Sequence, residues 1–183
     1  SGKTDFVEQA RYIAEKMNMP VAEPYKPVPF VEEPTFENVA ISRLESPALL
    51  RYLAERGIPK EIAQRYCVQV DYGLHGKRYY AIGFENNAHG YELRNQFFKG
   101  SFPPKNITRI SGGNPRCNVF EGFIDFLSAE RLGYNDGNDS VVLNSVANVG
   151  KAIPALAEYP LILCYLDNDT AGRAAVARLR REF

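Results

Sequence analysis

The 183 residues of this chain are 45% hydrophobic and 12% aromatic, and the formal net charge is zero. That much apolar sequence predicts a globular protein of one domain or two small ones, and the zero net charge argues against strong nonspecific attraction to nucleic acid. No apolar run approaches the ~20 residues that a membrane helix needs. The first residues show no signal-peptide pattern, so we expect a cytoplasmic protein with no membrane partner.

Residues 1–45 predict a short helix followed by a connector. Asp5 and Glu8 can cap an amphipathic helix that runs to Met17. Five prolines between Pro20 and Pro34 then favour an extended segment over packed secondary structure.

Residues 46–116 predict a small subdomain with helices first and antiparallel strands after them. Pro47 opens one helix, which Gly57 closes, and Pro59 opens another that runs to Tyr66. Turn-forming residues then separate three β-type segments: Val68–Leu74, Tyr79–Glu85 and Gly90–Phe98. Residues 71–116 carry seven Lys or Arg against three acids, which makes this segment basic.

Residues 117–183 alternate between strand and helix, which is typical of a parallel sheet with crossover helices. The expected elements are Cys117–Phe120, Gly122–Leu132, Val141–Leu143, Val149–Ala157, Leu161–Leu166 and Thr170–Arg181. We therefore predict an α/β domain here and an α+β chain overall. The three cysteines, Cys67, Cys117 and Cys164, are widely spaced in apolar stretches and are expected to be core thiols.

Acidic residues follow two of these strands. Glu121 comes after the first strand, and Asp167 and Asp169 come after the third. If these strands are neighbours, the acids meet at one sheet edge, and Asp125 lies one helical turn beyond Glu121. Clustered carboxylates repel each other, and Mg²⁺ binds carboxylate oxygens, so the pattern predicts a magnesium site. Asp169 can also simply cap the helix that begins at Thr170.

Three segments together resemble the Toprim domain, which bacterial primases, type IA and type II topoisomerases and certain nucleases share. These segments read VFEGFIDFLSAERLG, VVLNS and LILCYLDNDTAGRAAVARL. Upstream, LLRYLAERGIPKEIAQRYCV and YELRNQFFKGSFPPKNIT resemble the basic subdomain that precedes Toprim in bacterial primases. The resemblance spans about Pro47 to Arg181 and implies a Toprim-type parallel-sheet domain after a mixed helical and antiparallel subdomain.

The resemblance implies roles for particular residues. The catalytic residues would be Glu121, Asp125, Asp167 and Asp169, of which Glu121, Asp167 and Asp169 would bind Mg²⁺ or Mn²⁺. The residues that would contact nucleic acid or nucleotide are Arg94, Lys105, Lys77, Arg78 and Lys99. Zinc belongs to a separate primase domain that is absent from this chain.

The implied activity is DNA-directed synthesis of RNA primers by metal-dependent nucleotidyl transfer. The implied partners are a single-stranded DNA template, ribonucleotides and a replicative helicase. Because the sequence stops soon after the helix that follows Asp169, we expect a C-terminally truncated Toprim domain and an inactive fragment. Phe123 and Ile124 stand where bacterial primases commonly have tyrosine and methionine, which favours a divergent member from a mobile element.

Three other functions fit parts of the pattern. Asp167-Asn168-Asp169-Thr170 matches the nucleophile motif of haloacid-dehalogenase phosphatases, but that motif needs a long downstream region. A Toprim nuclease or topoisomerase fragment would nick DNA instead of adding nucleotides. A non-catalytic nucleic-acid-binding module would bind no Mg²⁺.

Overall fold

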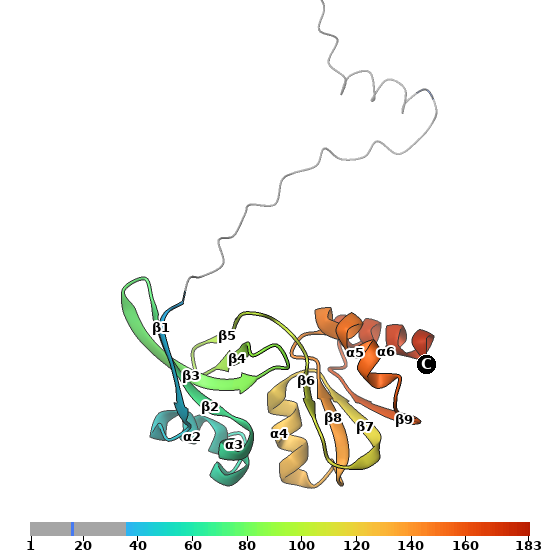
Figure 1. Ribbon diagram of the computed structural model, residues 1–183, viewed down its shortest axis with the longest axis horizontal. Coiled ribbons are helices and arrows are strands. Elements are labelled where there is room, and N and C mark those ends of the chain that lie inside the picture. The colour runs from blue at the N-terminus through green and yellow to red at the C-terminus, as the bar shows by residue number, and fades with distance from the viewer. Residues whose placement is uncertain (1–15, 17–35) are drawn as a thin grey trace, which may run out of the picture. The chain divides into compact units, whose positions relative to one another are not determined.

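The computed structural model describes Lys16 and residues 36–183 (Figure 1). Apart from Lys16, the helix expected over residues 5–17 and the connector expected over residues 20–34 lie outside the described residues. Within residues 36–183, the strands form one five-stranded antiparallel sheet and one four-stranded mixed sheet.

The antiparallel sheet has its strands in chain order. These are β1 (Glu37–Arg43), β2 (Val68–Leu74), β3 (Lys77–Glu85), β4 (Tyr91–Arg94) and β5 (Lys99–Phe102). Helices α2 (Pro47–Ala54) and α3 (Lys60–Tyr66) connect β1 to β2. Pro47 stands in the first turn of α2 and Gly57 has a φ of +74°, so proline and glycine delimit this helix as the sequence predicts.

Two differences from the expected strands have local causes. Strand β1 falls in the segment expected to be a connector, and nearly all of its residues are exposed, so it carries little apolar signal. The strand expected over Gly90–Phe98 ends at Arg94, because a turn follows in which the side chain of Asn95 accepts a hydrogen bond from the Phe97 N–H at 2.8 Å. Strand β5, which the sequence did not predict, begins after this turn at Lys99.

The mixed sheet has the strand order β6-β8-β7-β9. Strand β7 (Asn114–Phe120) pairs in parallel with both β8 (Asn138–Val142) and β9 (Leu161–Tyr165), which confirms the predicted parallel sheet. Strand β6 (Thr108–Ile110), which the sequence did not predict, adds an antiparallel edge next to β8. Cys164 is exposed because β9 lies at the other edge, whereas Cys67 and Cys117 are buried as expected.

Helices cover both faces of the mixed sheet (Figure 1). Helix α4 (Phe123–Leu132) follows β7 and packs on the side of α3, where it shares a core with the antiparallel sheet. A short 3₁₀ helix (Val146–Asn148), α5 (Val149–Leu156) and α6 (Thr170–Glu182) supply the second core on the opposite face. Among the described residues, we find no helix with the length and apolar character that crossing a membrane requires.

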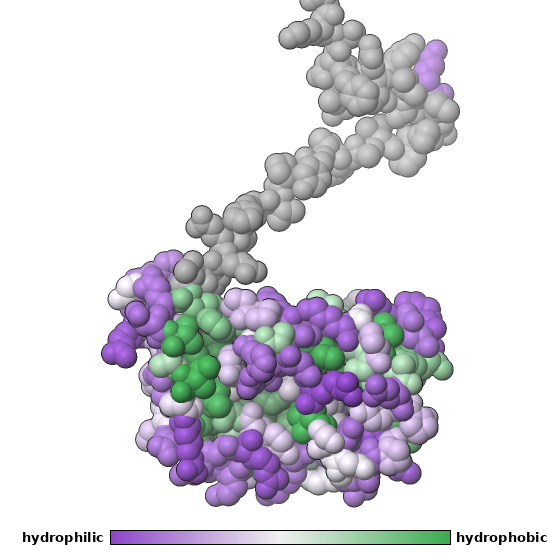
Figure 2. Space-filling view, viewed as in Figure 1, coloured by the Kyte–Doolittle hydropathy of each residue, from purple (hydrophilic) through white to green (hydrophobic). Residues whose placement is uncertain are grey.

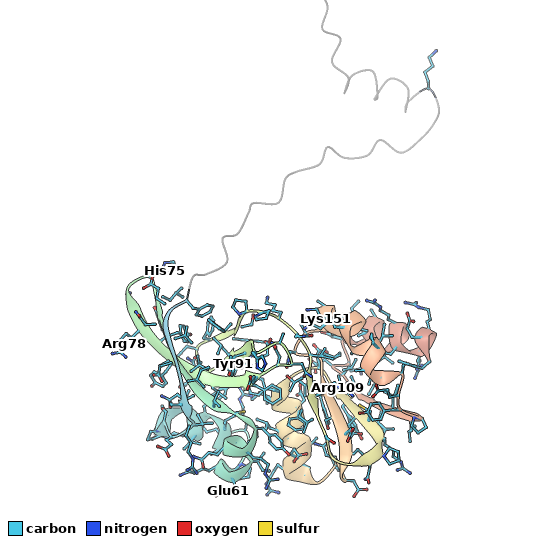
Figure 3. All side chains as sticks on the ribbon, in the orientation of Figure 1. Glu61, His75, Arg78, Tyr91, Arg109 and Lys151 are labelled. Carbon is cyan, nitrogen blue, oxygen red and sulfur yellow. The ribbon has the colours of Figure 1, made fainter. Side chains whose placement is uncertain are left out.

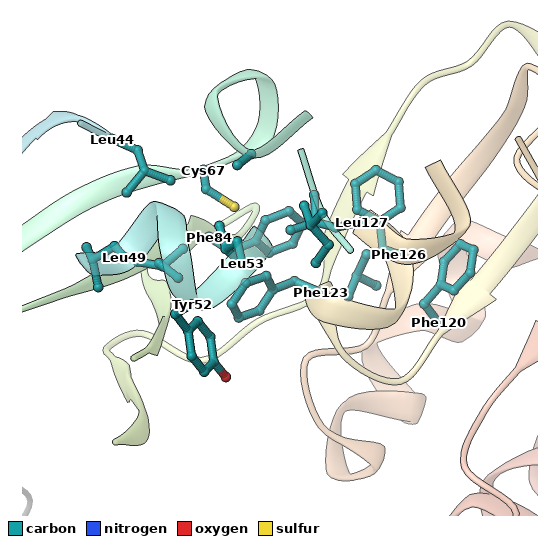
Figure 4. Close-up of a cluster of buried hydrophobic side chains, with 14 of the residues drawn as sticks. Leu44, Leu49, Tyr52, Leu53, Cys67, Phe84, Phe120, Phe123, Phe126 and Leu127 are labelled. Atoms are coloured by element: carbon teal, nitrogen blue, oxygen red, sulfur yellow. The ribbon is translucent and has the colours of Figure 1, made fainter. Parts of the chain in front are cut away.

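One hydrophobic core joins the two sheets (Figure 4). The ring of Phe84 on β3 stacks on that of Phe123 on α4, with centroids 5.2 Å apart. Phe126 packs edge-on against Tyr66 of α3, with centroids 4.8 Å apart, and the Tyr66 hydroxyl donates to Glu130 Oε2 at 2.8 Å. The antiparallel sheet and the mixed sheet are therefore held together by packing as well as by the chain.

A smaller hydrophobic cluster lies on the other face of the antiparallel sheet. Its buried members include Val70, Tyr72 and Leu93, and Phe36 packs edge-on against Tyr72. In Figure 2, hydrophobic side chains gather on the part of the surface where β1 lies. Helices α2, α3 and α4 pack on the opposite face of this sheet.

Replacing Phe126 with alanine tests the shared core. Phe126 is fully buried, so Phe126→Ala should lower the free energy of unfolding by about 3–5 kcal/mol, measured by urea denaturation. Leu132→Ala is the matched control, because Leu132 lies on the same helix and is 61% exposed; its effect should be about 0.5 kcal/mol or less. Equal effects of both substitutions would contradict the assigned core.

Candidate metal and nucleotide site

The carboxyl ends of β7 and β9 lie side by side. Phe120 and Tyr165 are paired across the two parallel strands, and their rings stack with centroids 5.2 Å apart. Glu121 follows β7 directly, and its Oε2 accepts a hydrogen bond from the Asp167 N–H at 3.2 Å. The two acidic segments therefore meet at one sheet edge, as their positions in the sequence predict.

The other two acids of the edge each accept a backbone hydrogen bond. Asp125 Oδ2 accepts from the Gly122 N–H at 3.2 Å, which caps the start of α4. Asp169 is the N-cap of α6, and its Oδ1 accepts from the Gly172 N–H at 2.7 Å. The helix-capping role expected of Asp169 is thus present in the structure, and the bond uses one of its two carboxylate oxygens.

Gly172 lets the first turn of α6 approach the loop that carries Asp167. A Cβ atom at this position would lie 2.0 Å from the Asp167 carbonyl oxygen, which is backbone and cannot rotate away. Gly172 therefore has a steric role. It permits the close contact that sets where Asp167 and Asp169 stand relative to each other.

The surroundings of this sheet edge disfavour the charged forms of two of its carboxyl groups. Desolvation raises the pKa of Glu121, and the negative charges of Asp167, Asp169 and Asp125 raise it further, against the hydrogen bond from the Asp167 N–H. Desolvation and the charge of Asp167 also raise the pKa of Asp125, while the positive charge of Lys99 opposes that rise. A cation at this edge would relieve the repulsion among these carboxylates.

The donor set fits a hard divalent cation in its chemistry, because Mg²⁺ and Mn²⁺ prefer carboxylate oxygens. Within the described part of the chain, however, no three His, Cys, Asp or Glu side chains are already gathered as a metal cluster. Glu121, Asp125 and Asp169 are turned toward backbone N–H groups instead. Cation binding would therefore use the carboxylate oxygens that do not accept these bonds, or would require the side chains to rotate toward a common point.

The predicted basic residues fall in two places. Arg94 and Lys99 are paired across β4 and β5, and Lys99 lies close enough to Asp125 to oppose the rise in its pKa. Lys77 and Arg78 lie at the β2–β3 hairpin, and Figure 3 shows Arg78 on the outer side of that hairpin, below its tip at His75.

Lys105 and Arg94 are each tied to other parts of the fold. Lys105 is exposed in the loop after β5, and its carbonyl oxygen accepts from Lys151 Nζ. Arg94 Nε donates to the Tyr52 hydroxyl at 2.9 Å, so Arg94 also ties β4 to α2.

Glu92 is a feature that the sequence analysis missed. It lies on β4 two residues before Arg94, so the alternation of the strand puts both side chains on one face of the sheet. Burial raises the pKa of Glu92 to about 7, against the opposing charges of Lys105 and Lys99. The only sequence signal was an acid among the basic residues of a strand.

The raised pKa of Glu92 predicts a pH-dependent stability. Between an unfolded-state pKa of 4.5 and a folded-state pKa of about 7, the folded protein holds more protons, so this side chain makes stability fall as pH rises. Glu92→Gln should therefore be more stable than the wild type at pH 8, with the difference closing near pH 4. Thermal unfolding of both proteins between pH 4 and pH 8 measures this difference in stability. A stability difference that is the same at pH 4 and pH 8 would contradict the prediction.

Two segments of the chain match known protein families. Residues 118–183 match the Toprim-like family, and residues 38–103 match a domain family of unknown function, DUF8464. No curated protein matches the chain.

Two solved structures share the fold of the chain. The primase fragment of the bacteriophage T7 primase-helicase protein has a TM-score of 0.53 and 19% identity, over 83% of this chain and 69% of that one. The second structure is of the bacteriophage T7 lagging-strand DNA polymerase interacting with primase domains that are bound to an RNA/DNA hybrid and dTTP. Its matching chain has a TM-score of 0.50 and 20% identity, over 80% of this chain and 76% of that one. Residues 118–183 therefore form a Toprim-like domain, and the chain shares its fold with these primase structures.

Proposed function

We propose that this protein is a primase-type nucleotidyltransferase that joins ribonucleotides on a single-stranded DNA template. The observation that carries the proposal is the contact between Glu121 and the Asp167 N–H at the carboxyl ends of two parallel strands. Ligands of open α/β sheets bind at such ends. The similar primase fragment belongs to a primase-helicase, and by extension we propose a replicative helicase as partner.

Glu121, Asp167 and Asp169 would hold Mg²⁺ or Mn²⁺, with Asp125 as a supporting acid. When bound, the cation would supply positive charge to phosphate oxygens and lower the pKa of an attacking hydroxyl group. The hydrogen bond from the Asp167 N–H would orient the Glu121 carboxylate, and the contact at Gly172 would fix the Asp167 loop.

The β4–β5 hairpin would hold the phosphates of template or nucleotide. We call the sheet edge that carries Glu121, Asp125, Asp167 and Asp169 the acidic edge. Lys99 is exposed and lies near Asp125, so one end of this hairpin carries positive charge close to the acidic edge. The guanidinium of Arg94 is positioned by the Tyr52 hydroxyl, which limits its movement. Template phosphates would bind to this basic side, and the metal would face the acidic side.

A primer-synthesis assay tests the function. Supplied with single-stranded DNA, ribonucleotides and Mg²⁺ or Mn²⁺, the full-length protein should make short RNA products. The double variant Asp167→Asn with Asp169→Asn should lose about 100-fold or more of this activity, as removal of charge stabilisation does in other enzymes. Asparagine keeps an oxygen that can accept from the Gly172 N–H, so the start of α6 is retained.

The matched control is Asp136→Asn, because Asp136 is an exposed acid that precedes β8, at the other end of the sheet. It should leave synthesis unchanged. Mn²⁺ binding followed by electron paramagnetic resonance separates a metal defect from a folding defect. Absence of product with both ions, or full activity in the double variant, would overturn the proposed function.

Salt dependence tests the basic hairpin. Lys99→Ala should weaken binding of single-stranded DNA and reduce the slope of log affinity against log salt by about 0.7, the amount for one phosphate contact. Lys60→Ala, which removes an exposed lysine from α3, should leave the slope unchanged. Fluorescence anisotropy with labelled oligothymidine at several salt concentrations measures both. Equal slopes for Lys99→Ala and the wild type would remove Lys99 from the interface.

A further inference from the structure

The turn between β4 and β5 has a fixed backbone. The Asn95 N–H donates to the Phe98 carbonyl oxygen at 3.0 Å, and the Phe97 N–H donates to Asn95 Oδ1 at 2.8 Å. Asn95 Nδ2 also donates to the Tyr80 carbonyl oxygen at 3.0 Å, which ties the turn to the neighbouring strand β3. Because Asn95 serves all three bonds, the direction of the side chains that follow it is set by the fold.

The two aromatic residues of this turn differ in burial: Phe98 packs against the sheet and Phe97 is exposed. The ring of Phe98 packs over the bare backbone of Gly100, where a Cβ atom would lie 2.3 Å from the ring, and it also contacts Tyr72. Phe97 is 91% exposed, more than any other large hydrophobic side chain found exposed in residues 36–183. Phe98 thus anchors the turn in the sheet, and Phe97 is presented to solvent.

The surroundings of Phe97 are basic and close to the acidic edge. The cross-strand pair Arg94 and Lys99 brackets the turn, and the charge of Lys99 acts on Asp125 at the acidic edge. An exposed ring on a turn with a fixed backbone, beside cations, matches the way proteins bind single strands: cations follow the phosphates while rings stack on the bases. A protein partner would be expected to require a wider apolar surface.

We propose that Phe97 is a stacking platform for a base of single-stranded nucleic acid as it enters the acidic edge. This proposal rests on the proposed function, and it adds a contact that uses no charge and tolerates any base. Arg94 and Lys99 would hold the backbone of the same strand, and Asn95 would keep the ring in position.

Tryptophan fluorescence tests the stacking directly, because the chain contains no tryptophan. In Phe97→Trp, the emission of the single indole should be quenched by unlabelled oligothymidine, and the quenching should saturate along the anisotropy binding curve. Phe97→Ala should weaken binding about 5- to 150-fold with an unchanged salt slope, since stacking contributes about 1–3 kcal/mol per base and releases no counterions.

Tyr134 provides the matched control, because it is a 62% exposed aromatic residue beyond the C-terminal end of α4. Tyr134→Trp should show no quenching, and Tyr134→Ala should bind as the wild type does. If the wild type binds oligothymidine but Phe97→Trp is not quenched, or Phe97→Ala binds normally, the stacking proposal is wrong and the proposed function stands. If the wild type binds no single-stranded DNA, both fail.

Discussion

The stacking of Phe84 on Phe123 is the contact on which the arrangement of the candidate site depends. Phe84 belongs to the antiparallel sheet, and Phe123 is the first residue of the helix that follows Glu121. The same helical turn that buries Phe123 and Phe126 leaves Asp125 exposed at the sheet edge. Packing of the rings therefore fixes the basic hairpin relative to the acids, and Lys99 is near Asp125 as a result.

Repulsion between carboxylates at the acidic edge destabilises the folded protein. Desolvation and mutual repulsion raise the pKa values of Glu121 and Asp125, so their charged forms destabilise the metal-free protein. The backbone N–H groups of Gly122, Asp167 and Gly172 offset part of that cost by donating to the carboxylates. Such local conflict is expected where residues are kept for binding and not for stability.

The sequence predicted the parts of the fold that depend on strong local patterns. The bounds of Val68–Leu74 and the order of strands and helices after residue 114 follow from apolar runs between glycine and proline signals. Strands β1, β5 and β6 were missed because they are short or exposed edge strands, which bury too little apolar surface to leave a pattern. The turn at Asn95 was missed because a side-chain hydrogen bond, which periodicity does not reveal, interrupts an otherwise strand-like segment. The meeting of Glu121 with Asp167 was predictable because strand order and strand ends suffice to place them.

The two readings of Asp169, as a helix cap and as a metal ligand, do not exclude each other. A carboxylate has two oxygens, and the cap at the Gly172 N–H uses only Oδ1. The N–H bond holds the carboxylate at the start of α6, where the helix dipole also favours a negative charge. The cap therefore occupies one oxygen of Asp169, and a cation could bind the other oxygen without breaking the cap. The common structural role of an aspartate before a helix is thus the physical basis on which a metal-binding role can be added.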